Sequence, residues 1–223
     1  MALDTVLFDL DGTLLDTAPD LAFALNRVRE EQGEGPLPFA RIRPVVSHGT
    51  VGLLRLGFGL EPDSARFPAL RERLLEIYRD HLAVHTAVFP GMSEVLDGIE
   101  ALGLRWGVVT NKPGWLTEPL LQQLDLTDRM ACIVSGDTVT QRKPDPAPML
   151  HACTLMGCTG GGCVYVGDAE RDIQAGRSAG MRTVVAAFGY IEEGHDPRTW
   201  GADAIVESPG ELLQWIRAAA DGA

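Results

Sequence analysis

The stretch Val6-Leu7-Phe8-Asp9-Leu10-Asp11-Gly12-Thr13 joins a short apolar run to two acids. The run predicts a buried strand, and the polar residues predict a turn at its carboxyl end. If the strand geometry continued, the two carboxylates would point the same way. Gly12 would let the backbone turn sharply and approach a ligand. The same letters can also form an ordinary turn, because Asp and Gly are common in turns.

Similar apolar runs recur along the chain and alternate with amphipathic stretches of helical length. Further strands are expected at 106–109, 132–134, 164–166, 183–185 and 204–206. Helices are expected at 92–102, 115–124, 146–156, 172–179 and 209–219. This alternation predicts an α/β domain with a mostly parallel sheet. The unbroken apolar character of the strands fits a sheet that is covered on both faces.

One region breaks the alternation. Between residues 16 and 88 the sequence shows no convincing strand, and helices are expected at 21–30, 39–46, 51–58 and 67–84. Phe89-Pro90-Gly91 marks the return to the alternating pattern. We therefore expect a core domain made of residues 1–15 and 89–223, with a helical module, residues 16–88, inserted after the first strand.

A second acidic motif, Gly167-Asp168 followed by Asp172, comes after another expected strand. Asp172 could serve only as a helix cap. Open parallel sheets, however, bind ligands at the carboxyl ends of their strands. Asp9, Asp11, Asp168 and Asp172 would then share one small volume, where like charges need compensation. Oxygen ligands without His or Cys point to a hard divalent cation, Mg²⁺ first of all.

Three further polar residues fall in loops that would face the same edge. Thr110 and Asn111 follow the strand at 106–109 and offer a hydroxyl and an amide to phosphoryl oxygens. Lys143 offers a compact positive charge to a phosphate or a carboxylate. The chain contains only two lysines, Lys112 and Lys143, and both lie in these loops. Taken singly, each residue could be a simple cap or a solvated charge, but the joint pattern favours a phosphate site.

Composition limits the possible partners. The 31 acidic and 19 basic residues give a formal net charge of −12. Nucleic acids and anionic membranes attract positive proteins, so neither is an expected partner. The four cysteines, Cys132, Cys153, Cys158 and Cys163, form no C-x-x-C pair and no zinc pattern. With no leader and no apolar run long enough to span a membrane, we expect a cytoplasmic protein with reduced thiols.

Together the four motifs resemble those of the haloacid dehalogenase superfamily, and the resemblance covers essentially the whole chain. It implies a Rossmann-like core with an inserted α-helical cap. It further implies that Asp9 is the nucleophile, Asp11 a general acid and base, and Asp168 a Mg²⁺ ligand. Asp172 would be a further ligand or would support one, and Thr110, Asn111 and Lys143 would bind phosphate.

Within that superfamily, the resemblance favours a Mg²⁺-dependent phosphomonoesterase that acts through an aspartyl-phosphate. Dehalogenases lack the second acid of the first motif, which is Asp11 here. Phosphonate hydrolases need a cap lysine, and residues 16–88 contain none. A phosphomutase resembling β-phosphoglucomutase stays open, as does a binding protein without activity.

The substrate is expected to be a small phosphorylated metabolite, and the enzyme a monomer or homodimer. The sequence resembles the phosphoglycolate phosphatases, and more closely a subgroup that acts on N-acetylmuramic acid 6-phosphate. His48 stands where that subgroup has a small residue. The cap residues expected to meet the rest of the substrate are Arg43, His48, Gly49 and Arg55. His81 and His85, four residues apart, are expected to have a structural or hinge-side role rather than to bind zinc.

Overall fold

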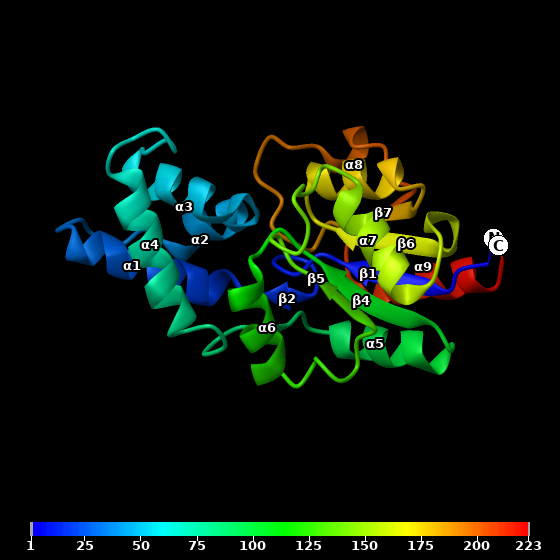
Figure 1. Cartoon of the computed structure of the whole chain (residues 1–223). Helices are drawn as coiled ribbons and strands as arrows, with labels where there is room; N and C mark the ends of the chain where they lie inside the picture. Colours follow the sequence, from blue (N-terminus) through cyan, green and yellow to red (C-terminus); the bar gives the residue numbers. More distant parts are fainter. Residues whose placement is uncertain (1, 223) are drawn as a thin grey trace.

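A six-stranded sheet forms the centre of the computed structural model, which describes residues 2–222 (Figure 1). In chain order its strands are β1 (Thr5–Phe8), β4 (Arg105–Val109), β5 (Cys132–Val134), β6 (Cys163–Gly167), β7 (Arg182–Ala186) and β8 (Ala204–Val206). They lie in the order β5-β4-β1-β6-β7-β8, and every neighbouring pair is parallel. The predicted α/β class with a mostly parallel sheet is confirmed.

Helices cover both faces of the sheet. The helices of the core are α5 (Met92–Ala101), α6 (Gly114–Gln123), α7 (Ala147–Met156), α8 (Glu170–Ser178) and α9 (Pro209–Ala220). Val6 and Phe8 of β1 belong to the same apolar cluster as α5 and α9, whereas Leu7 joins the cluster of α7. Successive strand residues point to opposite faces, so a sheet buried on both sides requires the continuous apolar runs seen in the sequence.

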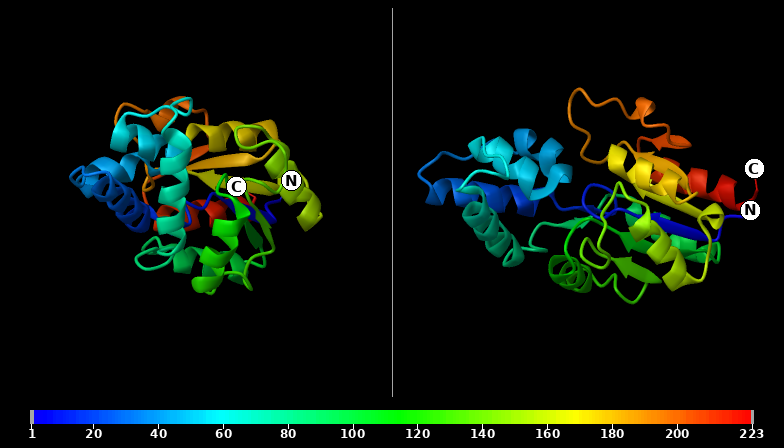
Figure 2. Two further views of the ribbon diagram at one scale, coloured as in Figure 1. Left: turned by 60° about the vertical axis from the view of Figure 1, so that its left-hand side comes forward. Right: turned by 45° about the horizontal axis from the view of Figure 1, so that its top comes forward.

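A separate group of helices lies beyond one end of the sheet (Figures 1 and 2). It contains α1 (Ala18–Glu31), α2 (Phe39–Ile42), a 3-10 helix (Arg43–His48), α3 (Gly49–Phe58) and α4 (Phe67–Arg79). We call these elements the cap helices. Helices α1, α3 and α4 pack against one another. Two short antiparallel strands, β2 (Leu15–Asp16) and β3 (Ala87–Val88), lead into this group and out of it.

The sequence-based prediction was wrong on two details at this junction. It expected no strand between residues 16 and 88, and a helix that continued to residue 84. Helix α4 ends at Arg79, and the buried carboxylate of Asp20 accepts the backbone N–H groups of His85 and Thr86, with Thr86 at 2.8 Å. These bonds turn the chain into β3. Two-residue strands held by backbone bonds leave no side-chain pattern to detect.

The remaining core elements match the predicted ranges within two residues. Helix α8 begins at Glu170 rather than at Asp172, because the Asp172 carboxylate accepts the N–H of Ala169 at 3.0 Å and so caps the first turn. No helix in the described residues is long and apolar enough to cross a membrane.

Candidate active site

Three buried carboxylates meet at the carboxyl edge of the sheet. Asp9 follows β1, Asp168 follows β6, and Asp172 lies in the first turn of α8. One oxygen from each lies within 4.8 Å of the others. Strands β1 and β6 are neighbours, with Phe8 opposite Val166. The residues that follow the two strands therefore emerge side by side, as expected for parallel strands.

Gly12 allows the two acidic loops to approach this closely. Its φ angle is +89°, in the region that favours glycine. A Cβ atom at this position would lie 2.2 Å from Oδ2 of Asp168, so any side chain would collide with that carboxylate. The sequence predicted that Gly12 would let the backbone approach a ligand, and in the structure its backbone approaches the Asp168 carboxylate.

Lys143 lies between two of the carboxylates. Its Nζ is 2.8 Å from Oδ1 of Asp9 and 2.8 Å from Oδ1 of Asp172. The same nitrogen donates to the carbonyl of Val109 and to the hydroxyl of Tyr165. An ammonium group has three N–H bonds for these four oxygens. The buried Oδ1 of Asp172 is therefore ion-paired with Lys143 without a well-directed hydrogen bond.

The pKa shifts show that one lysine does not balance three buried acids. Burial raises the pKa of Asp168 to about 7, and the charges of Asp9 and Asp172 raise it as well. Burial also raises the pKa of Asp172, although Lys143 opposes this. Asp9 differs: burial acts to raise its pKa, but Lys143 and Arg171 outweigh burial and hold it below the usual value. Of the three acids, Asp9 is therefore the one whose surroundings most favour the anionic form.

The donor set fits a hard cation. Asp9, Asp168 and Asp172 offer oxygen atoms only, with one oxygen of each within 4.8 Å of the others, and Oδ1 of Asp172 has no hydrogen bond besides its ion pair with Lys143. Hard divalent ions prefer oxygen ligands, and a positive charge here would relieve the repulsion that raises the pKa values of Asp168 and Asp172. These three residues could hold such an ion.

The carboxylate of Asp11 lies outside this group of three. Its Oδ1 is 2.9 Å from Nζ of Lys112 and accepts the hydroxyl of Thr17 at 2.6 Å. Lys112 in turn donates to the hydroxyl of Tyr78, which comes from helix α4 of the cap. The structure thus brings Asp11 to the site without placing its side chain beside the other acids. Its predicted roles as metal ligand and as acid and base stay predictions.

Thr110 and Asn111 occupy the loop after β4, but their side chains already have partners. The hydroxyl of Thr110 accepts the N–H of Lys112 at 3.1 Å. The amide of Asn111 donates to the carbonyl of Lys143 and accepts its N–H. Asn111 therefore braces the loop that carries Lys143. The predicted contacts of both residues with phosphate stay predictions, and both residues line the cavity.

A cavity of about 440 Å³ lies between the acids and the cap helices. Its core wall includes Asp9, Asp11 and Thr110, and its cap wall includes three of the four predicted cap residues, His48, Gly49 and Arg55. His48 pairs with Glu192 at 2.9 Å, and Arg55 forms two hydrogen bonds with Glu61. Both are exposed side chains, and each has an acid as its partner.

Arg43, the fourth predicted cap residue, is not among the residues that line the cavity. Its guanidinium donates to the carbonyl of Gly189, lies 3.5 Å from Asp16 and stacks over the ring of Tyr190. These contacts hold the cap helices against the core. The sequence-based prediction placed Arg43 at the substrate. Nothing in the sequence distinguishes an arginine that joins the cap helices to the core from one that lines the cavity.

Several residues of the site had no role assigned from the sequence, although the loop of Lys112 and the stretch from Ser47 to Thr50 were expected to face the site. Lys112 and Tyr78 link Asp11 to the cap, and Ser47 donates to Oδ2 of Asp168 at 2.7 Å. Arg71 and Arg171 line the cavity. The scarcity of lysine in this chain was a signal for Lys112. For Ser47 the signal was its place in the loop before Gly49, whereas nothing in the sequence distinguishes Arg71 from the other arginines.

His81 and His85 lie away from the carboxylates. The ring of His81 stacks on Phe23 with a centroid distance of 4.1 Å, and the N–H of His85 donates to Asp20. The His85 contact comes from its backbone, and the predicted structural or hinge-side role of the two histidines stays a prediction.

Comparisons with known proteins agree with this geometry. A family model described as haloacid dehalogenase-like hydrolase matches residues 6–186. The chain is 44% identical to N-acetylmuramic acid 6-phosphate phosphatase of Pseudomonas aeruginosa, over 96% of this chain and 94% of that protein. It is also 44% identical to phosphoglycolate phosphatase of Xanthomonas campestris pv. campestris, over 94% of each. The solved structure of a predicted phosphoglycolate phosphatase from Haemophilus somnus 129PT superposes with a TM-score of 0.84. That structure shares 24% identity and covers 96% of this chain and 97% of its own, which shows the fold.

Proposed function

The chain belongs to the haloacid dehalogenase-like hydrolases and is a phosphatase of that family, and from this premise we propose that it hydrolyses small phosphorylated acids through a phosphorylated Asp9. The observation that carries the proposal is the buried group of Asp9, Lys143, Asp168 and Asp172 beside the cavity. We also propose that residues 16–88 act as the cap over a core of residues 1–15 and 89–223.

Asp9 acts in two steps that together cleave one phosphate ester. Its carboxylate oxygen attacks phosphorus, the bond from phosphorus to the ester oxygen breaks, and Asp11 donates a proton to the leaving oxygen. Asp11 then accepts a proton from water, which attacks the aspartyl-phosphate and releases inorganic phosphate and free Asp9. The contacts from Lys112 and Thr17 fix the direction in which Asp11 presents its carboxyl group.

Positive charge near Asp9 stabilises the negative charge on the phosphoryl group during its transfer. Lys143 holds Asp9 in place, and Arg171 adds a second positive charge that favours its anionic form. We propose Mg²⁺ as the ion that Asp9, Asp168 and Asp172 hold. When bound, this ion would neutralise charge on the phosphoryl oxygens. The side chain of Asn111 holds the backbone of Lys143 next to the loop that follows β4.

The proposed substrates share a second acidic group. Phosphoglycolate and N-acetylmuramic acid 6-phosphate each carry a carboxylate as well as a phosphate. Arg71 of α4 lines the cavity and is exposed, and no described residue pairs with its guanidinium. Arginine is well suited to carboxylates because its planar fork can donate two parallel hydrogen bonds. We assign Arg71 to the carboxylate of the substrate.

We propose N-acetylmuramic acid 6-phosphate ahead of 2-phosphoglycolate. The two relatives are equally similar in sequence, so identity does not separate these substrates. The cavity of about 440 Å³ favours the larger molecule, because a two-carbon phosphate would leave much of the apolar lining from Leu21, Val46 and Leu75 uncovered. A side-by-side comparison of kcat/KM for the two compounds tests this choice, and a much higher value for 2-phosphoglycolate would overturn it.

The catalytic proposal is tested by Asp9→Asn with Asp4→Asn as the matched control. Asp4 is an exposed acid just before β1, far from the cavity. We expect Asp9→Asn to keep its near-ultraviolet circular dichroism but to release no phosphate from p-nitrophenyl phosphate above background, because an amide is no nucleophile. Asp4→Asn should match the parent rate. Turnover by folded Asp9→Asn at the parent rate would end the covalent mechanism.

A further inference from the structure

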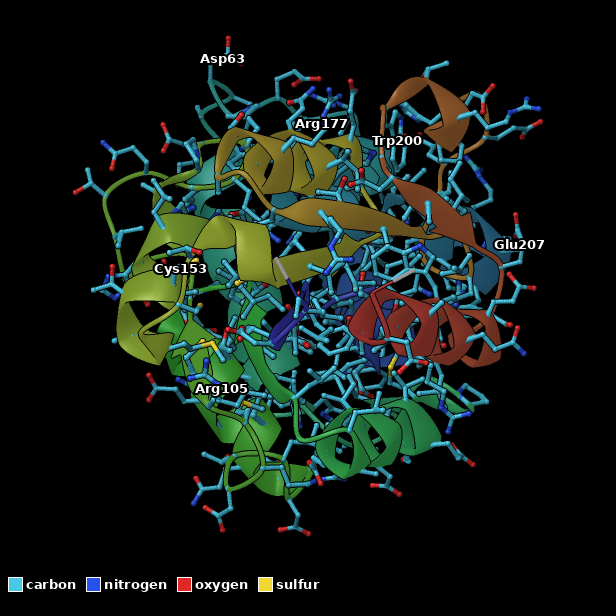
Figure 3. The ribbon with its side chains drawn as sticks, turned by 90° about the vertical axis from the view of Figure 1, so that its right-hand side faces the viewer. Asp63, Arg105, Cys153, Arg177, Trp200 and Glu207 are labelled. Carbon is cyan, nitrogen blue, oxygen red and sulfur yellow. The ribbon has the colours of Figure 1, made fainter. Side chains whose placement is uncertain are left out.

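Three cysteines that are apart in the sequence meet at the amino edge of the sheet. Cys153 lies on α7, Cys158 follows that helix, and Cys163 opens β6. One sulfur from each lies within 4.8 Å of the others. The carboxylates of the active site lie at the opposite end of β6, so the thiol group is separate from it. Figure 3 looks at the side of the molecule away from the cap helices, where Cys153 is labelled.

The chain between these cysteines is shaped to bring the sulfurs together. Gly157 has a φ angle of +63° and ends α7 in a left-handed turn. The N–H of Cys158 then donates to the carbonyl of Cys153 at 3.0 Å, which folds the loop back over the helix. The thiol of Cys163 donates to the carbonyl of Thr159 at 3.3 Å. A backbone bond on one side of Cys158, and on the other a bond from the Cys163 thiol to a backbone carbonyl, thus hold the three sulfurs close together.

The spacing of the sulfurs matches one shared ion. Sγ of Cys163 is 3.4 Å from Sγ of Cys158 and 4.0 Å from Sγ of Cys153. A zinc–sulfur bond of about 2.3 Å separates two thiolates of a tetrahedral or trigonal centre by roughly 3.8 to 4.0 Å. The separation from Cys158 lies below that range, and the separation from Cys153 lies at its upper end. Shifts of a few tenths of an ångström at most would bring these two pairs to the ideal distance.

The ligand type points to a soft ion. Three sulfur atoms and no carboxylate oxygen form this group, and thiolates are the ligands that soft ions select. A thiophilic ion displaces the thiol protons into solvent when it binds. Cys158 is half-buried and offers a route of entry.

We propose that Cys153, Cys158 and Cys163 form a three-thiolate site for one soft divalent ion of the zinc group. On binding, each thiol loses its proton to solvent and forms one sulfur–metal bond. Successive cysteines are five residues apart, which matches no common zinc pattern, so this site could not be predicted from spacing. The carboxylate site takes hard ions and this site takes soft ones, so the two would not compete for the same metal.

The probe is Cd²⁺, added to the reduced, untagged full chain in the presence of excess Mg²⁺. Thiolate ligands give cadmium an ultraviolet charge-transfer band that carboxylates do not. We expect this band to saturate at one Cd²⁺ per chain and the melting temperature to rise. Cys158→Ser should lose the band and bind Cd²⁺ roughly tenfold or more weakly. Its phosphatase rate should be unchanged, because Cys158 lies outside the active site.

Cys132→Ser is the matched control. Cys132 is a buried cysteine at the start of β5 that is not one of the three close sulfurs. It should keep the band and its stoichiometry. No band from the parent protein at one equivalent, an equal band from Cys158→Ser, or an equal loss in Cys132→Ser would each overturn the proposal. If Cys158→Ser does not fold, the stoichiometry of the parent band and Cys153→Ser decide the question.

Discussion

The two walls of the cavity differ in how firmly their side chains are held. On the core wall, Asp9 and Thr110 are buried and already hydrogen-bonded or ion-paired. On the cap wall, His48, Arg55 and Arg71 are exposed. Rigid, desolvated groups suit chemistry on a phosphoryl group, which is common to all candidate substrates. Exposed groups suit recognition of the part that differs. Substitutions in the core wall should therefore change kcat, and substitutions in the cap wall should change KM.

Lys143→Met should have the largest effect in this series. Removing the ammonium group leaves Asp9 and Asp172 without their shared partner. We expect kcat to fall roughly 10³-fold, the size seen when one preorganised donor is lost. The metal-free protein should also melt at a lower temperature, with part of the loss restored by Mg²⁺. Phosphate release and thermal melts with and without Mg²⁺ measure both effects. An unchanged kcat would contradict the claim that residues of the core wall determine the rate of the chemical step.

Tyr78→Phe removes the hydroxyl through which helix α4 of the cap contacts Lys112, and so tests the link between the two walls. Burial raises the pKa of Tyr78 to about 12, so its hydroxyl stays protonated and accepts from Lys112. Removing the hydroxyl leaves Lys112 with Asp11 alone. We expect kcat for p-nitrophenyl phosphate to fall about tenfold, with a smaller change in KM. Phe23→Leu, a partly exposed aromatic of the cap helices outside the cavity, is the control. A change in KM alone would show that Tyr78 belongs to the cap wall.

Arg71→Met should separate carboxylate recognition from chemistry. Losing a charge-assisted pair costs about 1.5 to 3 kcal/mol, or roughly 10- to 100-fold in KM for substrates with a carboxylate. The rate on p-nitrophenyl phosphate, which has no carboxylate, should stay the same. Arg41→Met, an exposed arginine on α2 that does not line the cavity, is the matched control. Equal losses on both substrates would remove Arg71 from substrate recognition.

Ser47→Ala should have the smallest effect. Ser47 comes from the cap helices, and its hydroxyl donates to Asp168 across the boundary between the walls. A single, partly exposed hydrogen bond contributes about 1 kcal/mol, so we expect a change of roughly fivefold in KM. Steady-state kinetics with the preferred substrate measure it. A loss as large as that of Lys143→Met would mean that Ser47 belongs to the core wall.

The same contrast explains what the sequence could predict. Asp9, Asp168 and Lys143 follow strands or stand in loops beside them, and strand runs are local patterns that one sequence displays. Their convergence then follows from the parallel topology. The roles of Asn111 and Arg43 could not be predicted, because each depends on a partner far along the chain, Lys143 in one case and Gly189 in the other. The strands β2 and β3 are set by the Asp20 carboxylate and backbone pairing rather than by apolar periodicity.

The thiol group shows the same limit at the other end of the sheet. Cys158 and Cys163 are five residues apart, and Gly157 and the backbone bonds of the loop decide that their sulfurs meet. A spacing rule cannot show this. Sequence reasoning succeeds where a side chain is placed by its own strand, and it fails where placement depends on a turn and a distant neighbour.

The claim that three buried acids share one hard ion beside Asp9 is tested most directly by metal dependence. The full chain is treated with a chelator, the chelator is removed, and phosphate release from p-nitrophenyl phosphate is followed while Mg²⁺ is added back. The account predicts no turnover above background without metal and a saturable return of activity with Mg²⁺. Full activity in excess chelator would contradict it.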